Sequence, residues 1–262
     1  MSQLFAVAVV LGFSFSSMAE QPDGVLSWNF TFEQGKEGWT GDFAHLYVDY
    51  DPDMFELEFA HTDWPEDLGQ PGKALMISGV NRSDDLFMYV KRRLGPEDGV
   101  LPGVTYRARF VVELATDAPP GLIGPGGAPG EAVWVKVGAA PEEPVPVVID
   151  WAGKPYYVMN VDKGYQRDEG QHAIMIGDAA KESGGVDDWS YELKTLDNLD
   201  RPLEVTADEQ GSLWVFVGTD SGFEGKTTLY YTSIEVELQP IDDTPTAVQN
   251  DSWGAIKEAV VQ

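Results

Sequence analysis

A polar turn in the first third of the chain has the side chains needed to recognise a hydrogen-bonding ligand. Residues 79–85 read GVNRSDD, and the side chains with the most hydrogen-bonding capacity are Asn81, Arg82, Asp84 and Asp85. Together they offer donors and acceptors, as recognition of a polyol or a charged small molecule requires. The alternative is an ion pair between Arg82 and a neighbouring aspartate that only pins the turn.

Two tryptophans could stack on a sugar ring. In the strand predicted at residues 133–137, alternation places Trp134 and Lys136 on the outward face. A flat indole there could bury the apolar face of a pyranose. If that strand is buried on both faces, Trp134 belongs to the core instead. Trp64 lies in a polar loop at residues 61–65, where we expect an exposed ring.

Acidic side chains in a glycine-rich segment near the end of the chain could hold a divalent cation. Residues 218–225 read GTDSGFEG and include Asp220 and Glu224. Carboxylate oxygens are the ligands that calcium prefers. The same side chains could hydrogen-bond sugar hydroxyls, or simply cap the backbone of their own loop.

Catalytic motifs are missing from the sequence. The three histidines have no metal-ligand spacing, and neither a GxSxG elbow nor a phosphate-binding loop is present. A pair of carboxylates could flank a glycosidic bond, but a chain with 44 acidic residues contains such pairs by chance. The sequence therefore favours a protein that is not an enzyme.

The composition is strongly acidic. The chain of 262 residues has 44 Asp and Glu against 17 Lys and Arg, a net charge of -27. Such a surface repels DNA phosphates and anionic lipid head groups, so nucleic acid is excluded as a partner. The excess suits a protein dissolved in salty water, one that holds divalent cations, or one kept soluble by self-repulsion.

The N-terminus has the pattern of a secretory signal peptide. An apolar run at residues 4–13 precedes Ser17-Met18-Ala19, a small-x-small cleavage pattern, so we predict a signal peptide at residues 1–19. No other stretch is long and apolar enough to span a bilayer. The absence of cysteine excludes disulfides and an N-terminal lipid anchor. We expect a secreted or periplasmic bacterial protein.

Alternation of apolar and polar residues predicts an all-β fold. It is clearest at residues 106–115, and residues 38–43 are expected to form a loop. The predicted strands are residues 25–32, 55–60, 74–78, 86–92, 106–115, 133–137, 145–150, 156–161, 173–176, 191–196, 213–217 and 229–238. The short strands and frequent turns predict a jelly-roll-like antiparallel β-sandwich.

We expect one β-sandwich domain at residues 20–240. Residues 139–200 are an irregular elaboration within it, since no linker separates them from their neighbours. Residues 241–262 read as a linker and a short helical tail. The stretch 213–238 should form a closing hairpin with an acidic loop at its tip, whose last strand pairs with the first strand of the domain.

Several motifs together resemble an uncharacterised family of secreted bacterial β-sandwich proteins. They are WNFTFEQGKEGWTGDFA, SGVNRSDDLFMYVKRR, PGGAPGEAVWVKVG and LWVFVGTDSGFEGKTTLYYTSIEV, and the resemblance covers most of residues 28–238. More loosely, the opening FxFE-x-G-x-x-GW resembles carbohydrate-binding modules of the jelly-roll type. That resemblance implies a structural calcium held by an acid after the first strand, here Glu33. The modules also have an acid in the last strand, where this chain reads YTSI, so a calcium site would depend on Glu33, Asp220 and Glu224.

These patterns lead to one principal hypothesis and two alternatives. The principal hypothesis is a secreted, non-catalytic protein that binds a carbohydrate or a related cell-envelope ligand, with a structural calcium ion. The first alternative is a glycan-active hydrolase or lyase on the same fold. The second is a structural envelope protein without a small ligand.

Overall fold

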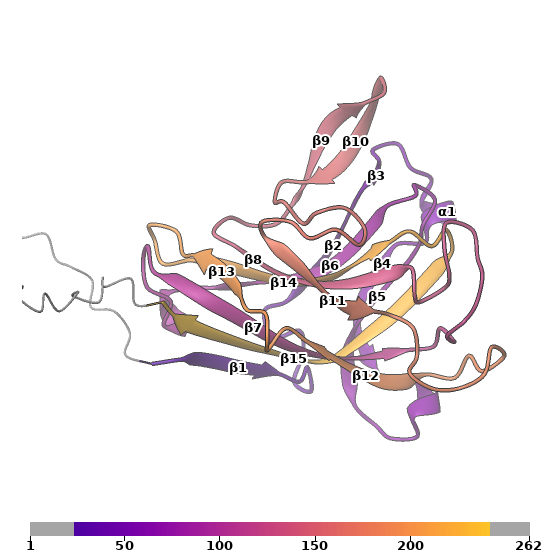
Figure 1. Cartoon of the computed structure of the whole chain (residues 1–262), viewed down its shortest axis with the longest axis horizontal. Helices are drawn as coiled ribbons and strands as arrows, with labels where there is room; N and C mark the ends of the chain where they lie inside the picture. Colours follow the sequence, from indigo (N-terminus) through magenta and orange to yellow (C-terminus); the bar gives the residue numbers. More distant parts are fainter. Residues whose placement is uncertain (1–23, 242–262) are drawn as a thin grey trace, which may run out of the picture.

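A computed structural model of the chain describes residues 24–241. The predicted signal peptide at residues 1–19 and nearly all of the predicted tail at 241–262 lie outside the described residues. Within them the chain is nearly all β-structure in antiparallel sheets, which confirms the predicted fold class (Figure 1). No helix of this part of the chain is long and apolar enough to cross a membrane.

Two antiparallel sheets form the sandwich. The first sheet contains, in spatial order, β12 (Glu192–Asp197), β7 (Thr105–Thr116), β15 (Lys226–Pro240), β5 (Lys73–Val80) and β4 (Glu58–Asp63), with β1 (Leu26–Phe30) beside β15 and β13 (Leu203–Thr206) beside β7. The second sheet contains β11 (Ala173–Asp178), β8 (Val133–Ala140), β14 (Leu213–Ser221), β6 (Leu86–Leu94) and β2 (Thr40–Ala44). The pairing of β1 with β15 confirms that the last strand pairs with the first.

The main core lies between the two sheets. Strand β7 contributes five buried residues at alternate positions, as the sequence predicted: Tyr106, Ala108, Phe110, Val112 and Leu114. The second sheet is also covered on its other face, where a smaller apolar cluster includes Phe87, Tyr89, Met159 and Phe216. Strands β6 and β14 are therefore buried along nearly their whole length.

Three local predictions were wrong. Residues 38–43 were expected to form a loop because of their glycines. Instead β2 forms an edge strand, because β6 lies beside it and supplies backbone hydrogen-bond partners. Residues 55–60 were expected to form one strand. Instead Asp51 caps the short helix α1 (Pro52–Phe55) by accepting a hydrogen bond from the Asp53 amide, and β4 begins only at Glu58. Strands β14 and β15 lie in different sheets and form no hairpin.

A third, small sheet completes the fold. It consists of β9 (Pro146–Trp151), β10 (Lys154–Met159) and the two-residue strand β3 (Leu46–Tyr47), in the order β3-β10-β9. The β9–β10 hairpin projects beyond the sandwich at the top of Figure 1. Two single-turn 3₁₀ helices, η1 (Glu66–Leu68) and η2 (Pro96–Asp98), lie in connections between strands.

Candidate functional site

The small sheet has two faces with different side chains. Tyr156 pairs with Tyr47 on one side and with Ile149 on the other, and Trp151 pairs with Lys154. Because side chains alternate along a strand, these residues share one face, whereas Tyr157 points to the opposite face. Each face borders a pocket.

The first pocket, which we call the aromatic pocket, has a volume of about 230 Å³. Four of its lining side chains are the rings of Tyr47, Trp151, Tyr156 and Tyr165. The Tyr156 ring centroid lies 5.1 Å from that of Tyr47 and 6.0 Å from that of Trp151. Trp151 and Tyr165 are 57% and 50% exposed, so their rings are open to solvent at the pocket edge.

Strained backbone gathers around the aromatic pocket. His45 and Asp84, which line it, have φ angles of 63° and 70°. Gln166 has a φ of 46°, and its side-chain amide donates a hydrogen bond to the backbone carbonyl oxygen of Asp84 at 3.0 Å. Left-handed conformations of non-glycine residues cost about 1–3 kcal/mol each and concentrate at functional sites. Here the left-handed backbone at His45 and Asp84 places the side chains of these two residues at the pocket wall.

Beneath the pocket lies a group of charged side chains that we call the buried ion cluster: Asp85, Lys136, Lys163 and Asp220. The Asp220 carboxylate is fully buried and accepts from the Lys163 ammonium at 2.7 Å and from the Lys136 ammonium at 2.9 Å. Lys163 also lies 4.0 Å from Asp85. Asp85 lines the pocket, so the cluster reaches the ligand-accessible surface through that residue.

The two lysines also fix the loop at residues 160–172. The Lys136 ammonium donates to the carbonyl oxygens of Lys163 and Asp168, both at 2.8 Å. The Lys163 ammonium donates to the Gly164 carbonyl oxygen at 3.2 Å. Tyr165 belongs to this loop and lines the pocket, so the hydrogen bonds from the two lysines help to position its ring.

Burial shifts the titration of several groups at the site, and Asp220 and His45 are the two that bear on its charge near neutral pH. Burial raises the pKa of Asp220 to about 6; the Lys163 ammonium opposes this shift and the neighbouring Asp85 carboxyl adds to it. Burial, followed by the charge of Lys163, lowers the pKa of His45 to about 3, so its imidazole is neutral at physiological pH. The Nδ1 atom of His45 lies 2.6 Å from the Asp85 carboxylate and donates to it, which leaves Nε2 without a proton.

The lowered pKa of His45 gives a testable pH dependence. Below about pH 6.5 the unfolded chain binds a proton at His45 that the folded protein excludes until about pH 3, so this group makes the fold less stable as pH falls. The expected loss is about 2 kcal/mol between pH 7 and pH 5. His45→Asn tolerates the positive φ and should remove that part of the dependence.

The measurement is urea unfolding of both proteins at the two pH values. Burial raises the pKa of Asp220 and of Asp85, so both titrate in the opposite sense to His45 and are present in both proteins; the difference between wild type and variant therefore reports the removal of His45. An identical pH dependence of wild type and variant would contradict the assignment.

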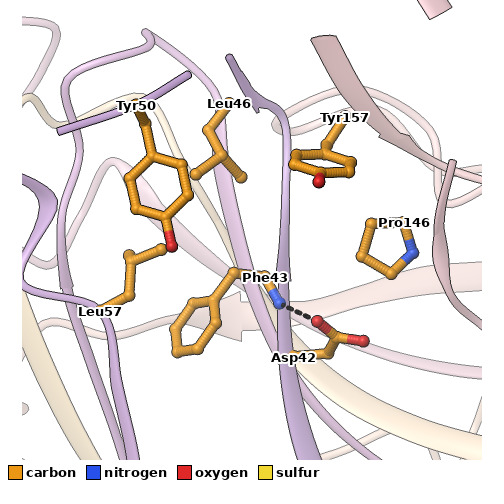
Figure 2. A pocket seen from close by; sticks show the side chains of 7 residues that line it. All are labelled: Asp42, Phe43, Leu46, Tyr50, Leu57, Pro146 and Tyr157. Atoms are coloured by element: carbon orange, nitrogen blue, oxygen red, sulfur yellow. Dashed lines mark hydrogen bonds between the residues drawn. The ribbon is translucent and has the colours of Figure 1, made fainter. Parts of the chain in front are cut away.

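The second pocket, which we call the apolar pocket, lies on the other face of the small sheet and has a volume of about 270 Å³. Figure 2 shows Tyr50 and Tyr157 on either side of Leu46, with Asp42 and Pro146 below Tyr157. The Asp42 carboxylate already accepts from the Phe43 amide at 2.9 Å and lies 3.5 Å from the Lys91 ammonium. The aromatic pocket combines four aromatic rings with the exposed carboxylate of Asp84, so it is the better candidate site.

The structure brings two residues of the predicted polar turn to the aromatic pocket, Asp84 and Asp85. The other two serve elsewhere. Asn81 is buried and donates to the carbonyl oxygens of Ser221 and Phe223, which ties the turn to the end of β14. Arg82 is exposed and does not line the aromatic pocket.

The predicted stacking tryptophans and their neighbour lie outside the aromatic pocket. Trp64 is half-buried and donates from its indole to the Lys73 carbonyl oxygen at 2.8 Å, which anchors its loop. Trp134 is half-buried and packs against Gly222. Lys136 lies on the face of β8 turned away from the main core, as predicted, but the second sheet is covered on both faces, which is the alternative given above, so this side chain is fully buried and cannot contact a ligand.

The residues predicted to hold calcium do not form one site. Asp220 lies in β14 between two ammonium groups, not in a loop at the rim, while Glu224 is exposed and Glu33 accepts from the Lys73 amide. Within residues 24–241, no group of three or more His, Asp or Glu side chains is arranged to hold a metal ion.

Calcium binding stays a prediction that melting experiments test. A structural calcium ion should raise the melting temperature in calcium relative to chelator, because a ligand of the folded state stabilises it. Equal melting temperatures in the two buffers would reject the prediction.

Apart from Asp84 and Asp85, the residues that line the aromatic pocket were not predicted as site residues. His45 and Tyr47 come from the β2–β3 region, Tyr165 from the loop after β10, and Trp151 and Tyr156 from the hairpin. A signal was present in the hairpin, where Val147, Ile149 and Trp151 alternate with other residues before an Ala-Gly turn. This pattern predicts a strand with one apolar face.

Comparison with known proteins gives likenesses of structure alone. No family model matches the chain, and no curated protein matches it. A structure of carbohydrate-binding modules from the β-sandwich superfamily is 15% identical with a TM-score of 0.36, over 81% of this chain and 61% of that one, so the chain spans less than two thirds of its length.

Two further structures are similar at the same level. The CBM22-1 xylan-binding domain from Paenibacillus barcinonensis Xyn10C is 12% identical with a TM-score of 0.38, over 86% of this chain and 100% of that one. The K1 cleaved adhesin domain of Lys-gingipain from Porphyromonas gingivalis W83 is 12% identical with a TM-score of 0.35, over 82% of this chain and 99% of that one.

Proposed function

We propose that this protein binds a carbohydrate in the aromatic pocket and does not cleave it. The observation that carries the proposal is the set of four rings around a cavity of about 230 Å³, two of them half exposed. Ligand pockets combine a mostly apolar lining with a few polar groups that orient the ligand. The aromatic pocket has this composition.

The rings and the polar groups suit different parts of a sugar. A flat ring such as that of Trp151 covers the apolar C–H face of a pyranose. Sugar hydroxyls are both donors and acceptors, and the polar side chains that line the pocket, among them Asp84, Asp85 and Ser83, can pair with them. Since strained backbone and the buried ion cluster hold these groups, little ordering is needed when a ligand binds.

The titratable groups favour binding over hydrolysis. Glycoside hydrolysis requires two carboxyl groups about 5–9.5 Å apart on either side of the bond. Two carboxyl groups line this pocket, Asp84 and Asp85, but Asp85 is buried and held by the His45 imidazole at 2.6 Å, so only Asp84 is exposed to a ligand. Asp220 is fully buried between its lysine partners. His45, with a pKa of about 3, is a weak base at neutral pH.

Secretion to the periplasm or the cell exterior, where polysaccharides of the cell envelope are available, remains part of the proposal. An envelope protein without a small ligand is the competing account, and the two differ in whether the pocket is used.

A glycan array and affinity electrophoresis on residues 20–262 test the proposal. We expect saturable binding to at least one polysaccharide class, competed by its oligosaccharides. Absence of binding to every polysaccharide, together with capture of protein partners that is unaffected by Trp151→Ala, would reject it. Release of shortened products would instead show an enzyme.

A further inference from the structure

We infer that the ligand of the aromatic pocket carries a positive charge, so that amino sugars with free amines are preferred over neutral sugars. This inference rests on the proposed function and specifies its ligand class. It is carried by three features of the pocket: the arrangement of its rings, the charge balance of its lining and the position of Lys154.

The rings form a partial cage. Tyr47, Trp151 and Tyr156 approach one another from two strands and the hairpin end, and Tyr165 closes the set from the loop at 160–172. Aromatic faces attract a cation placed within about 6 Å of the ring centroid. Several rings around one cavity recognise an alkylammonium group better than a neutral one.

Lys154 already makes such a contact on this face. Its ammonium nitrogen lies 5.4 Å from the centroid of the Tyr47 ring. The face of the small sheet thus accommodates an ammonium group of the protein itself. A ligand ammonium deeper in the pocket would meet more rings than Lys154 does.

The charge at the pocket is negative. In the buried ion cluster two lysines offset Asp85 and Asp220, and Asp84 adds an exposed carboxylate to the lining. Lys154, over the Tyr47 ring, is the cation on this face, and a bound ligand ammonium would share the negative potential with it. Among the described residues that line the pocket, none is Lys or Arg. Burial raises the pKa of Tyr165, and the charges of Asp85 and Asp84 raise it further, so this ring lies in a negative potential.

The charge of the whole chain acts in the same direction. A net charge of -27 draws cationic ligands towards the protein and repels anionic ones such as uronate chains. Because this attraction acts through solvent, added salt should weaken it.

Titration calorimetry with three hexamers of the same β-1,4 linkage tests the inference, in mildly acidic buffer where free amines are charged. The hexamers consist of glucosamine, N-acetylglucosamine and glucose. We expect the glucosamine hexamer to bind at least about tenfold more tightly than the other two, with the preference reduced by salt. Asp84→Asn, which tolerates the positive φ at this position, should abolish the preference.

The outcomes separate this inference from the proposed function. Equal binding of all three hexamers would overturn the inference and leave carbohydrate binding intact. A preference for the glucosamine hexamer that Asp84→Asn does not change would also overturn it. Failure of every glycan to bind would overturn both.

Discussion

Replacing Asp220 with asparagine is expected to lower the free energy of unfolding by about 3–5 kcal/mol. The side chain is fully buried and is the shared partner of the Lys136 and Lys163 ammonium groups, at 2.9 and 2.7 Å. Asparagine has nearly the same shape, so the change removes the charge and leaves two ammonium groups without it. A buried charge deprived of its partner is costly because it remains out of water.

Urea unfolding with a fitted m-value measures the effect, since an unchanged m shows that only stability has changed. The double variant Asp220→Asn with Lys136→Met should lose less than the sum of the two single variants, because it removes one of the ammonium groups without a partner. If Asp220→Asn does not fold, the single variant Lys136→Met replaces it in the unfolding experiment. It should also lower the free energy of unfolding, because the carbonyl oxygens of Lys163 and Asp168 lose their donor.

A matched control is the pair Lys226 and Glu56, which lie 2.6 Å apart but are about half exposed. Lys226→Met should leave the unfolding midpoint close to that of wild type, because exposed ion pairs contribute little. If Asp220→Asn were as mild as Lys226→Met, the buried ion cluster would not have the structural role assigned to it.

Replacing Trp151 with alanine is expected to weaken carbohydrate binding by at least about tenfold, which corresponds to ~1.4 kcal/mol. The indole is 57% exposed at the end of β9, next to the Tyr156 ring, where it can cover a sugar. Truncation of an aromatic anchor in a binding site commonly costs more than about 1 kcal/mol. Because the side chain is largely solvated, the fold should be little affected.

The control for this variant is Trp189→Ala. Trp189 is 50% exposed, nearly as much as Trp151, but it lies in the connection before β12 and lines no part of the aromatic pocket. It should leave the dissociation constant unchanged in the same titration. Equal losses from the two variants, or no loss from Trp151→Ala, would contradict binding at this pocket.

A second matched pair distinguishes the two faces of the hairpin. Tyr156 and Tyr157 are neighbours in β10, but the first borders the aromatic pocket and the second the apolar pocket. Tyr156→Ala should weaken binding, whereas Tyr157→Ala should not. The opposite result would place the ligand in the apolar pocket of Figure 2.

The sequence predicted most of the sandwich because alternation is a local property. The strand at residues 106–115 has five apolar residues at alternate positions, and each of them faces the core. The errors arose where pairing partners decide the outcome. Residues 40–44 contain glycine and aspartate but become a strand because β6 lies beside them, and β14 and β15 separate because each pairs with strands distant in sequence.

The site was harder to predict because it is assembled from four distant segments. Asp84 and Asp85 were predicted from the hydrogen-bonding capacity of their turn, and both line the pocket. The rings come from β3, the hairpin and the following loop, and no local pattern shows that these segments meet. Lys136 does lie on the outward face of its strand, but the sequence left open whether that face is covered, because the residues that cover it lie far along the chain.

An NMR titration of the ¹⁵N-labelled protein shows whether a saccharide occupies the aromatic pocket. The titrant is the tightest-binding oligosaccharide of the glycan panel, and the indole signals are assigned by single substitutions. We expect saturable shifts of the Trp151 indole and of the backbone amides of Tyr165 and Gln166, with the Trp189 indole unmoved. Saturable shifts at Trp189 or Trp134 with none at Trp151 would contradict it.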